Sequence, residues 1–251
     1  MARVFDGIGS GDHLRYDTAV RTGPPFTLAA WFRSITVNNN QALLSLASVI
    51  SDYNSFVLIA MGGVLGDPIQ ARQYDGAVAF AQTTTGFSAN TWHHAAGVWA
   101  STTDRRVFID GGSKGTDATS NSPANLGNTT IGAQWYAPGP AIDAEFPGRI
   151  AEAGIWNVAL SDDEIALLAK GFSCLFFQPQ NLIAYWPLIR DDDLDRKGNA
   201  NMTDYGSVTV EEHPPKIIYP APQFISHKSG AVAADAMPMA MQQYRIRRVS
   251  A

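Results

Sequence analysis

The stretch GRIAEAGIWNVALSDDEI (residues 148–165) joins a clear strand pattern to the clearest helix start of the chain. Its first part, RIAEAGIW (149–156), is apolar with β-branched and aromatic members, which is typical of a strand. Ser161 and Glu164 then have the spacing of a capping box, in which the serine caps the first turn and the glutamate reaches back to the cap N–H. Gly171 stands where a glycine commonly ends a helix. The sequence therefore predicts a strand followed by a short helix over residues 162–170.

Strand patterns of the same kind fill the first 211 residues. They are short, apolar, and separated by clusters of Gly, Asn, Asp and Pro. The other segments are FTLAAWFRSI (26–35), ALLSLASVI (42–50), SFVLIAM (55–61), GAVAFAQT (76–83), TWHHAAGVWA (91–100), RRVFID (105–110), TTIGAQW (129–135) and LIAYWPL (182–188). Many short strands at this spacing indicate a sandwich or a barrel. Several are apolar on both faces, which suits the inner parts of a two-sheet sandwich.

Composition narrows the class of protein. Hydrophobic residues make up 45% of the chain and charged residues 16%, so a sizeable core is available. The net charge of −5 argues against a nucleic-acid binder, which is normally basic.

No window approaches the ~20 apolar residues of a membrane span. The first residues lack the apolar region of a signal peptide, so we expect synthesis in a cytoplasm without membrane insertion. The single cysteine, Cys174, allows no intramolecular disulfide and lies among apolar residues, which predicts a buried thiol.

The motifs and their order resemble laminin-G-like, concanavalin A-like jelly-roll domains. VFDGIGSGDHLRYD (4–17) followed by PFTLAAWFR (25–33) resembles the opening strands of that family, and TWHHAAGVWA (91–100) its W-H-H strand. Within 148–165 the residues matching the family pattern are Gly148, Ile150, Glu152, Ile155, Trp156, Asn157, Ala159, Leu160, Ser161, Glu164 and Ile165. The resemblance spans roughly residues 3–211. It implies an all-β fold, a two-sheet antiparallel jelly-roll sandwich with one short helix.

His93 and His94 are adjacent, and successive side chains of a strand point to opposite faces. The two imidazoles therefore cannot both reach one metal ion from a regular strand. We expect one ring to pack inside the sandwich with a hydrogen-bond partner. The other should face solvent or a loop.

The resemblance also raises the question of catalysis, because concanavalin A-like folds include β-glucanases. Retaining cleavage needs two carboxyl groups about 5–5.5 Å apart, which a strand provides as Glu-x-Asp-x-(x)-Glu. The chain has no such run, since Glu152 is followed two residues later by Gly154. A phosphate-binding glycine motif and a G-x-S-x-G elbow are missing as well. We therefore expect a protein that is not an enzyme.

No cofactor is expected, with calcium as an alternative. Many laminin-G-like domains bind one Ca²⁺ at a loop rim through carboxylate and carbonyl oxygens, which this cation prefers. The densest acidic group consists of Asp191, Asp192, Asp193 and Asp195. The alternative is a solvated loop, which is what such charge runs usually form. At the position before Glu152 the family often has Asp, and this chain has Ala151, which weakens a metal role for that segment.

Trp135 and Tyr136 mark a candidate glycan site. Aromatic faces bind the apolar side of pyranose rings, so the two side chains could stack on a sugar. An ordinary loop or a protein contact is the alternative reading.

The amino-acid composition of the sequence changes from residue 212. The segment 212–224 holds four prolines, which rule out a central strand. Residues 212–251 therefore read as an extended C-terminal arm beside the domain 1–211. We expect this arm to be anchored mainly on a partner chain, with the chain's own domain as the alternative. The apolar residues expected to anchor it are Ile217, Ile218, Tyr219, Phe224, Ile225, Met237 and Met239.

Three functions are compatible with these patterns. The first is a structural module of a large assembly, and we expect a tailed-phage virion protein, such as a capsid decoration or head-surface subunit, whose partners are other virion proteins. The second is a lectin-like module that binds cell-surface glycans. The third, a glycoside hydrolase, fits least well. Location in a virion is expected, with a cytoplasmic or released protein as the alternative.

Overall fold

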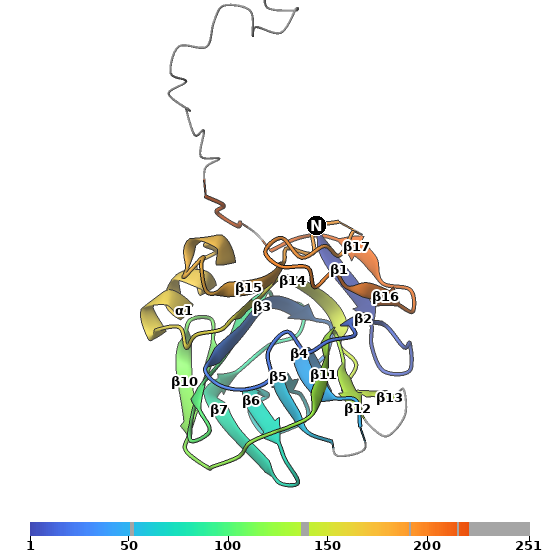
Figure 1. Ribbon diagram of the computed structural model, residues 1–251. Helices are drawn as coiled ribbons and strands as arrows, with labels where there is room; N and C mark the ends of the chain where they lie inside the picture. Colours follow the sequence, from blue (N-terminus) through green and yellow to red (C-terminus); the bar gives the residue numbers. More distant parts are fainter. Residues whose placement is uncertain (51–52, 137–140, 191, 215, 221–251) are drawn as a thin grey trace, which may run out of the picture. The chain divides into compact units, whose positions relative to one another are not determined.

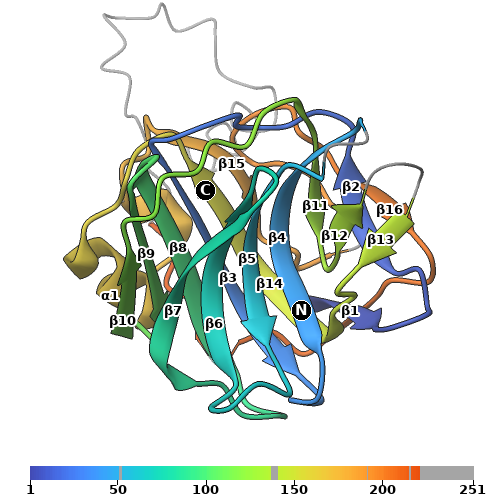
Figure 2. The same cartoon turned by 90° about the horizontal axis from the view of Figure 1, so that it is seen from below.

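The protein is described by a computed structural model. It describes residues 1–50, 53–136, 141–190, 192–214 and 216–220. These residues form a two-sheet antiparallel sandwich with one α-helix, which confirms the predicted fold class (Figures 1 and 2). Within them no helix is long and apolar enough to cross a membrane.

The larger sheet has eight strands in the order β10-β9-β8-β3-β14-β1-β17, with β15 also paired to β14. Its strands are β1 (Ala2–Asp6), β3 (Phe26–Ser34), β8 (His93–Ser101), β9 (Asp104–Ile109), β10 (Gly112–Asp117), β14 (Pro147–Trp156), β15 (Leu182–Trp186) and β17 (Thr209–Glu211). All of the pairings in this sheet are antiparallel.

The second sheet has seven strands in the order β16-β2-β11-β4-β5-β6-β7. Its strands are β2 (His13–Tyr16), β4 (Asn40–Ser48), β5 (Ser55–Met61), β6 (Pro68–Tyr74), β7 (Val78–Gly86), β11 (Leu126–Ile131) and β16 (Thr203–Tyr205). A separate hairpin is formed by β12 (Gln134–Tyr136) and β13 (Ala141–Asp143). The predicted strand 129–135 is therefore two strands, interrupted at Gly132, whose φ is +84°.

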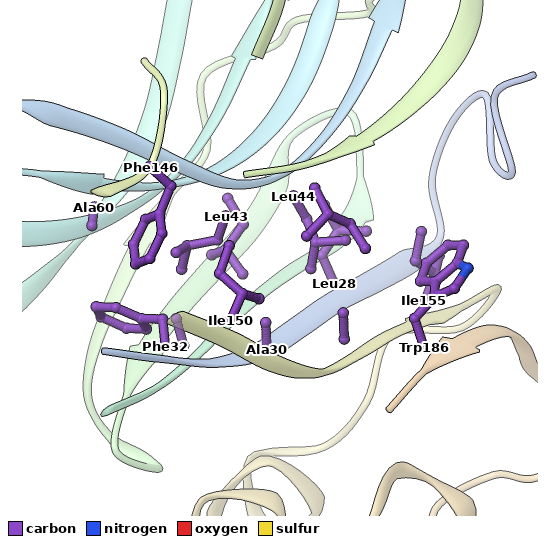
Figure 3. Packing of buried hydrophobic residues seen from close by; sticks show 14 of the residues in the cluster. Leu28, Ala30, Phe32, Leu43, Leu44, Ala60, Phe146, Ile150, Ile155 and Trp186 are labelled. Atoms are coloured by element: carbon purple, nitrogen blue, oxygen red, sulfur yellow. The ribbon is translucent and has the colours of Figure 1, made fainter. Parts of the chain in front are cut away.

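The core fills the space between the two sheets. Figure 3 shows Leu28 and Ile150 of the larger sheet on one side of the core and Leu44 of the smaller sheet on the other. All three are fully buried. A buried side chain of this kind contributes roughly 1.5–3 kcal/mol through the apolar surface removed from water. The apolar side chains that point inward from the two sheets thus form one continuous core.

Strand β14 contains an irregularity that decides where Glu152 points. Its pairing with β3 shifts register between Ala151 and Gly154, and Glu152 has a φ of +54°. Ile150 and Ala153 both belong to the core between the sheets. In a regular strand Glu152 would share the face of Ile150. The bulge instead turns the carboxylate to the outer side of the sheet.

The outer face of the larger sheet is covered by α1 (Asp162–Ala169) and a short 3₁₀ turn, η1 (Cys174–Phe176). The predicted capping box is present, because the Ser161 side chain accepts from Glu164 N–H and the Glu164 side chain accepts from Ser161 N–H. Gly171 has a φ of +89°, the left-handed conformation expected after the helix end. Cys174 is buried in the apolar cluster beneath this layer.

The first compact unit of the chain runs from Met1 to Pro220, beyond the expected boundary at residue 211. Residues 221–251 form the second unit and lie outside the described residues. The predicted anchors Phe224, Ile225, Met237 and Met239 fall in that part.

Candidate functional site

A cavity opens on the outer face of the seven-stranded sheet. Its volume is about 240 Å³. It is lined by Tyr53, Ser55, Arg72, Tyr74, Val78, Gln134 and Asp143. We call it the sheet-face cavity. It combines aromatic and apolar surface with amide, guanidinium and carboxylate groups, which is the composition of a small-molecule site.

The floor of the sheet-face cavity follows from the register of β5, β6 and β7. Tyr74 lies between Ser55 and Val78 on neighbouring strands, because these residues are direct partners in the ladder. One pair further along, Arg72 lies beside Phe80. Phe80 is 42% exposed and Val78 50% exposed. The sheet therefore presents apolar and aromatic side chains to solvent next to one cation.

Arg72 is held in place by its neighbours. Its Nη2 donates to Gln70 Oε1 at 2.9 Å and lies 3.2 Å from Met61 Sδ. Gln70 in turn donates from Nε2 to Gln82 Oε1 at 2.8 Å. Burial lowers the pKa of Arg72, and the nearby carboxylate of Asp143 opposes this shift. The guanidinium keeps its charge, since an arginine is protonated at any physiological pH. Within the described residues its Nη1 has no hydrogen-bond partner and remains available to a ligand.

The β12–β13 hairpin forms one wall of the sheet-face cavity through Gln134 and Asp143. Gln134 Nε2 donates to Ser55 Oγ at 3.2 Å. Asp143 accepts the N–H of Ala144 through Oδ1, at 2.8 Å. Asp143 also borders a second cavity of about 300 Å³, together with Glu145. Both carboxylate oxygens of Glu145 accept backbone N–H groups from the loop 7–11, so this side chain organises the loop.

The predicted glycan residue Trp135 lies on the same hairpin but does not line the sheet-face cavity. The guanidinium of Arg15 sits over its ring, 4.6 Å from the centroid, and 4.4 Å from the centroid of Tyr205. A cation–π contact therefore occupies one face of the indole. The side chain of Tyr136 lies outside the described residues.

The acidic run 191–195 finds protein partners. Asp195 accepts N–H groups of four residues: Tyr185, Lys197, Gly198 and Ala200. Asp193 pairs with Arg3 at 3.0 Å, and Asp192 pairs with Arg196 at 2.7 Å. Asp191 lies outside the described residues. In the part of the chain that the structure describes, there is no group of three or more His, Cys, Asp or Glu side chains that could hold a metal ion.

His93 and His94 point to opposite faces of β8, as expected. Their ladder partners on β3 are Phe32 and Trp31, respectively. His93 packs 5.7 Å from Phe32, accepts Ser88 N–H at Nε2 (3.1 Å) and contacts Asp110 Oδ2 through Nδ1 (2.7 Å). The prediction of an inner, hydrogen-bonded ring is confirmed.

Of the two surroundings expected for the other ring, solvent or a loop, solvent is wrong. His94 is only 2% exposed, and its ring lies 5.5 Å from that of Trp31. Burial lowers the pKa of His94 from 6.5 to about 4, so the ring is neutral near pH 7. The alternation of the strand holds, but the outer face of this sheet is itself covered by a further layer.

The C-terminal strap, residues 216–219, lies on the chain's own domain. Ile218 N–H donates to Gly171 O at 2.7 Å, and Ser173 N–H donates to Ile218 O at 2.9 Å. Tyr219 Oη donates to Glu152 Oε1 at 2.6 Å. Of the two surfaces expected to hold Ile217, Ile218 and Tyr219, the structure therefore provides the chain's own. Ile218 and Tyr219 remain 37% and 42% exposed.

Sequence reasoning missed β6, which carries Gln70, Arg72 and Tyr74. Its sequence PIQARQY alternates Ile69, Ala71 and Gln73 toward the core with polar side chains outward. This alternation with a period of two is the sequence signal that could have predicted the strand. The segment lacks the apolar run by which the other strands were recognised.

Comparisons with known proteins agree with this architecture. A model of the concanavalin A-like lectin/glucanases superfamily matches residues 8–166, and the chain belongs to this family. The predicted resemblance is thereby confirmed. No match is found among curated proteins.

Several solved structures share the fold. A heptameric SAP-like pentraxin from Limulus polyphemus is 14% identical, with a TM-score of 0.60, over 83% of this chain and 93% of the pentraxin. A putative carbohydrate binding protein from Bacteroides ovatus is 17% identical, with a TM-score of 0.58, over 87% of this chain and 62% of that protein. The CBM40 of a Ruminococcus gnavus IT-sialidase is 16% identical, with a TM-score of 0.52, over 65% of this chain and 96% of the module. At these identities the likeness concerns the fold.

Proposed function

We propose that this domain binds a glycan in the sheet-face cavity and does not cleave it. The observation that carries the proposal is the placement of Tyr74 beside Arg72 on the exposed face of β6. A tyrosine ring offers an apolar face to the C–H side of a pyranose. The guanidinium and the amide of Gln134 offer donors to its hydroxyl groups, and Asp143 offers an acceptor. The volume of about 240 Å³ suits one sugar ring rather than a long stretch of chain.

Family membership supports this proposal, because the family includes lectins. Two structures that share the fold are described as a carbohydrate-binding protein and a carbohydrate-binding module, which adds support at the level of the class. The expectation that the protein is a virion subunit, located in a virion, stays a prediction.

We expect no cleavage because of the number of carboxylates at the sheet-face cavity. Glycoside hydrolysis requires a pair of them, one to protonate the leaving group and one to act as nucleophile or base. Among the described residues Asp143 is the one carboxylate that lines the sheet-face cavity. Glu145, in the adjoining cavity, is bound on both oxygens by backbone N–H groups.

The test is a glycan array with the full chain and two variants, Arg72→Ala and Tyr74→Ala. Both should lose the signal of every glycan that the wild type binds. Arg33→Ala is the matched control, because Arg33 lies on β3 of the other sheet and donates to Asn90 O. A wild-type protein that binds no glycan, or variants that bind as the wild type does, would refute the proposal.

A further inference from the structure

A third cavity lies on the opposite side of the sandwich, next to α1. Its volume is about 360 Å³. It is lined by Trp31, Trp92, Ala169, Lys170, Gly171, Pro214 and Lys216. We call it the helix-side cavity. It belongs to the eight-stranded sheet and shares no lining residue with the sheet-face cavity.

Two half-buried tryptophans give the helix-side cavity its aromatic surface. Trp31 comes from β3, and Trp92 directly precedes β8. Trp31 rests on the buried, neutral ring of His94, with the two rings at 62°. This contact with His94 fixes the position of the Trp31 indole. Within the described residues neither indole N–H has a hydrogen-bond partner.

The opposite wall is built by the strap and the end of α1. A Cβ on Gly171 would lie 2.3 Å from the carbonyl oxygen of Lys216, so only a glycine allows the strap to pass this close. The bonds of Ile218 to Gly171 and Ser173 fix the strap there. Lys170 and Lys216 are thereby brought to one cavity, although 46 positions separate them in the sequence.

Among the described residues, the charge that lines the helix-side cavity is positive and has no counter-charge in the lining. Lys170 and Lys216 are exposed, and neither ammonium group makes an ion pair or a hydrogen bond with any described residue. No carboxylate is among the described residues that line it. His94 does not add to this charge, since burial keeps its ring neutral. An anionic ligand would supply the missing counter-charge.

We propose that the helix-side cavity binds a carboxylate-bearing sugar ring of the hexuronic acid class. The ring would stack on Trp31 and Trp92, and its carboxylate would contact the ammonium groups of Lys170 and Lys216. This site is additional to the proposed function, and it would confer a preference for acidic glycans. It uses other residues than the sheet-face cavity, so each of the two proposals can be tested independently.

The test compares two probes that differ at one carbon, methyl β-D-glucuronide and methyl β-D-glucopyranoside. The chain has six tryptophans, so binding can be followed by the six indole N–H resonances of the ¹⁵N-labelled full chain. Trp31→Phe and Trp92→Phe variants assign two of these resonances. The glucuronide should shift both in a saturable manner and bind roughly tenfold or more tightly than the glucoside, as charge-assisted hydrogen bonds imply. The glucuronide affinity should also fall with added salt.

The lysines are tested by the double variant Lys170→Ala/Lys216→Ala. Both side chains are exposed, so the fold should be unaffected, and the preference for the glucuronide should disappear. Lys114→Ala/Lys197→Ala removes the same charge elsewhere and should keep the preference. Arg72→Ala and Tyr74→Ala should keep it too, which separates this site from the sheet-face cavity. Equal affinity for the two probes, no shift of the Trp31 and Trp92 resonances, or an unchanged preference in the double variant would overturn the proposal.

Discussion

The hydroxyl of Tyr219 donates to the carboxylate of Glu152 across 2.6 Å, although 67 residues separate them in the chain. Glu152 is 3% exposed and accepts a second hydrogen bond, from Tyr185 Oη, also at 2.6 Å. His213 Nε2 lies 3.4 Å away. Burial and the charge of Glu152 raise the pKa of Tyr219 well above its ordinary value, so the hydroxyl keeps its proton and stays a donor. The bulge of β14 thus creates an acceptor that fixes the end of the domain.

Tyr219→Phe should destabilise the protein by about 1–2 kcal/mol, because a hydrogen bond to a buried charged group is lost without loss of volume. Urea melts followed by tryptophan fluorescence measure the change. Tyr16→Phe is the control, since the hydroxyl of Tyr16 has no partner among the described residues; it should cost under about 0.5 kcal/mol. Equal effects of the two substitutions would show that the Glu152 contact adds no stability.

Two truncations separate the strap from the rest of the C-terminal region. Removal of 221–251 should leave the free energy of unfolding within about 0.5 kcal/mol of the full chain, because the unit Met1–Pro220 keeps all of its internal contacts. Removal of 212–251 also takes away the Tyr219 bond and the Ile218 backbone bonds. It should cost at least about 2 kcal/mol more. Identical melts of the two truncated proteins would contradict the assignment of the strap to this domain.

Local sequence patterns were sufficient for β14 and α1. The capping residues Ser161 and Glu164 are neighbours in sequence, so their geometry is encoded locally. The position of the strap could not be predicted from local sequence patterns. The apolar character of Ile218 and Tyr219 indicates that they need a partner, but not which surface provides it. That surface depends on the bulge at Glu152, where one positive φ turns a side chain from the core to the outside.

The sheet-face cavity was likewise only partly predictable from local sequence. The residues of the sheet-face cavity come from strands and a hairpin, and the alternation of β6 would have placed Arg72 and Tyr74 on one face. The hairpin's approach to that face depends on tertiary packing. The predicted Trp135 lies one position from Gln134, so the alternation of β12 sends it to the other side.

A broad panel of β-glucans and alginates incubated with the protein should release no reducing sugar. Among the described residues the sheet-face cavity offers one carboxylate, and retaining or inverting cleavage needs two. Release that disappears in Asp143→Asn would contradict this expectation and make Asp143 a catalytic residue.

The buried ring of His94 should make stability depend on pH between about 6.5 and 4. Its pKa is 6.5 in an unfolded chain and about 4 in the fold, where burial disfavours the charged form. As pH falls through this window, the unfolded chain takes up a proton that the folded protein does not. Stability is therefore lost on acidification, by about 3 kcal/mol for this group at pH 4. His94→Gln should flatten the slope of unfolding free energy against pH over the window, measured by urea melts at half-unit steps. The pKa of His13 is lowered by burial as well, so His13→Gln should flatten the slope further and in addition to His94→Gln. An unchanged slope in His94→Gln would mean that this ring is protonated within the folded protein.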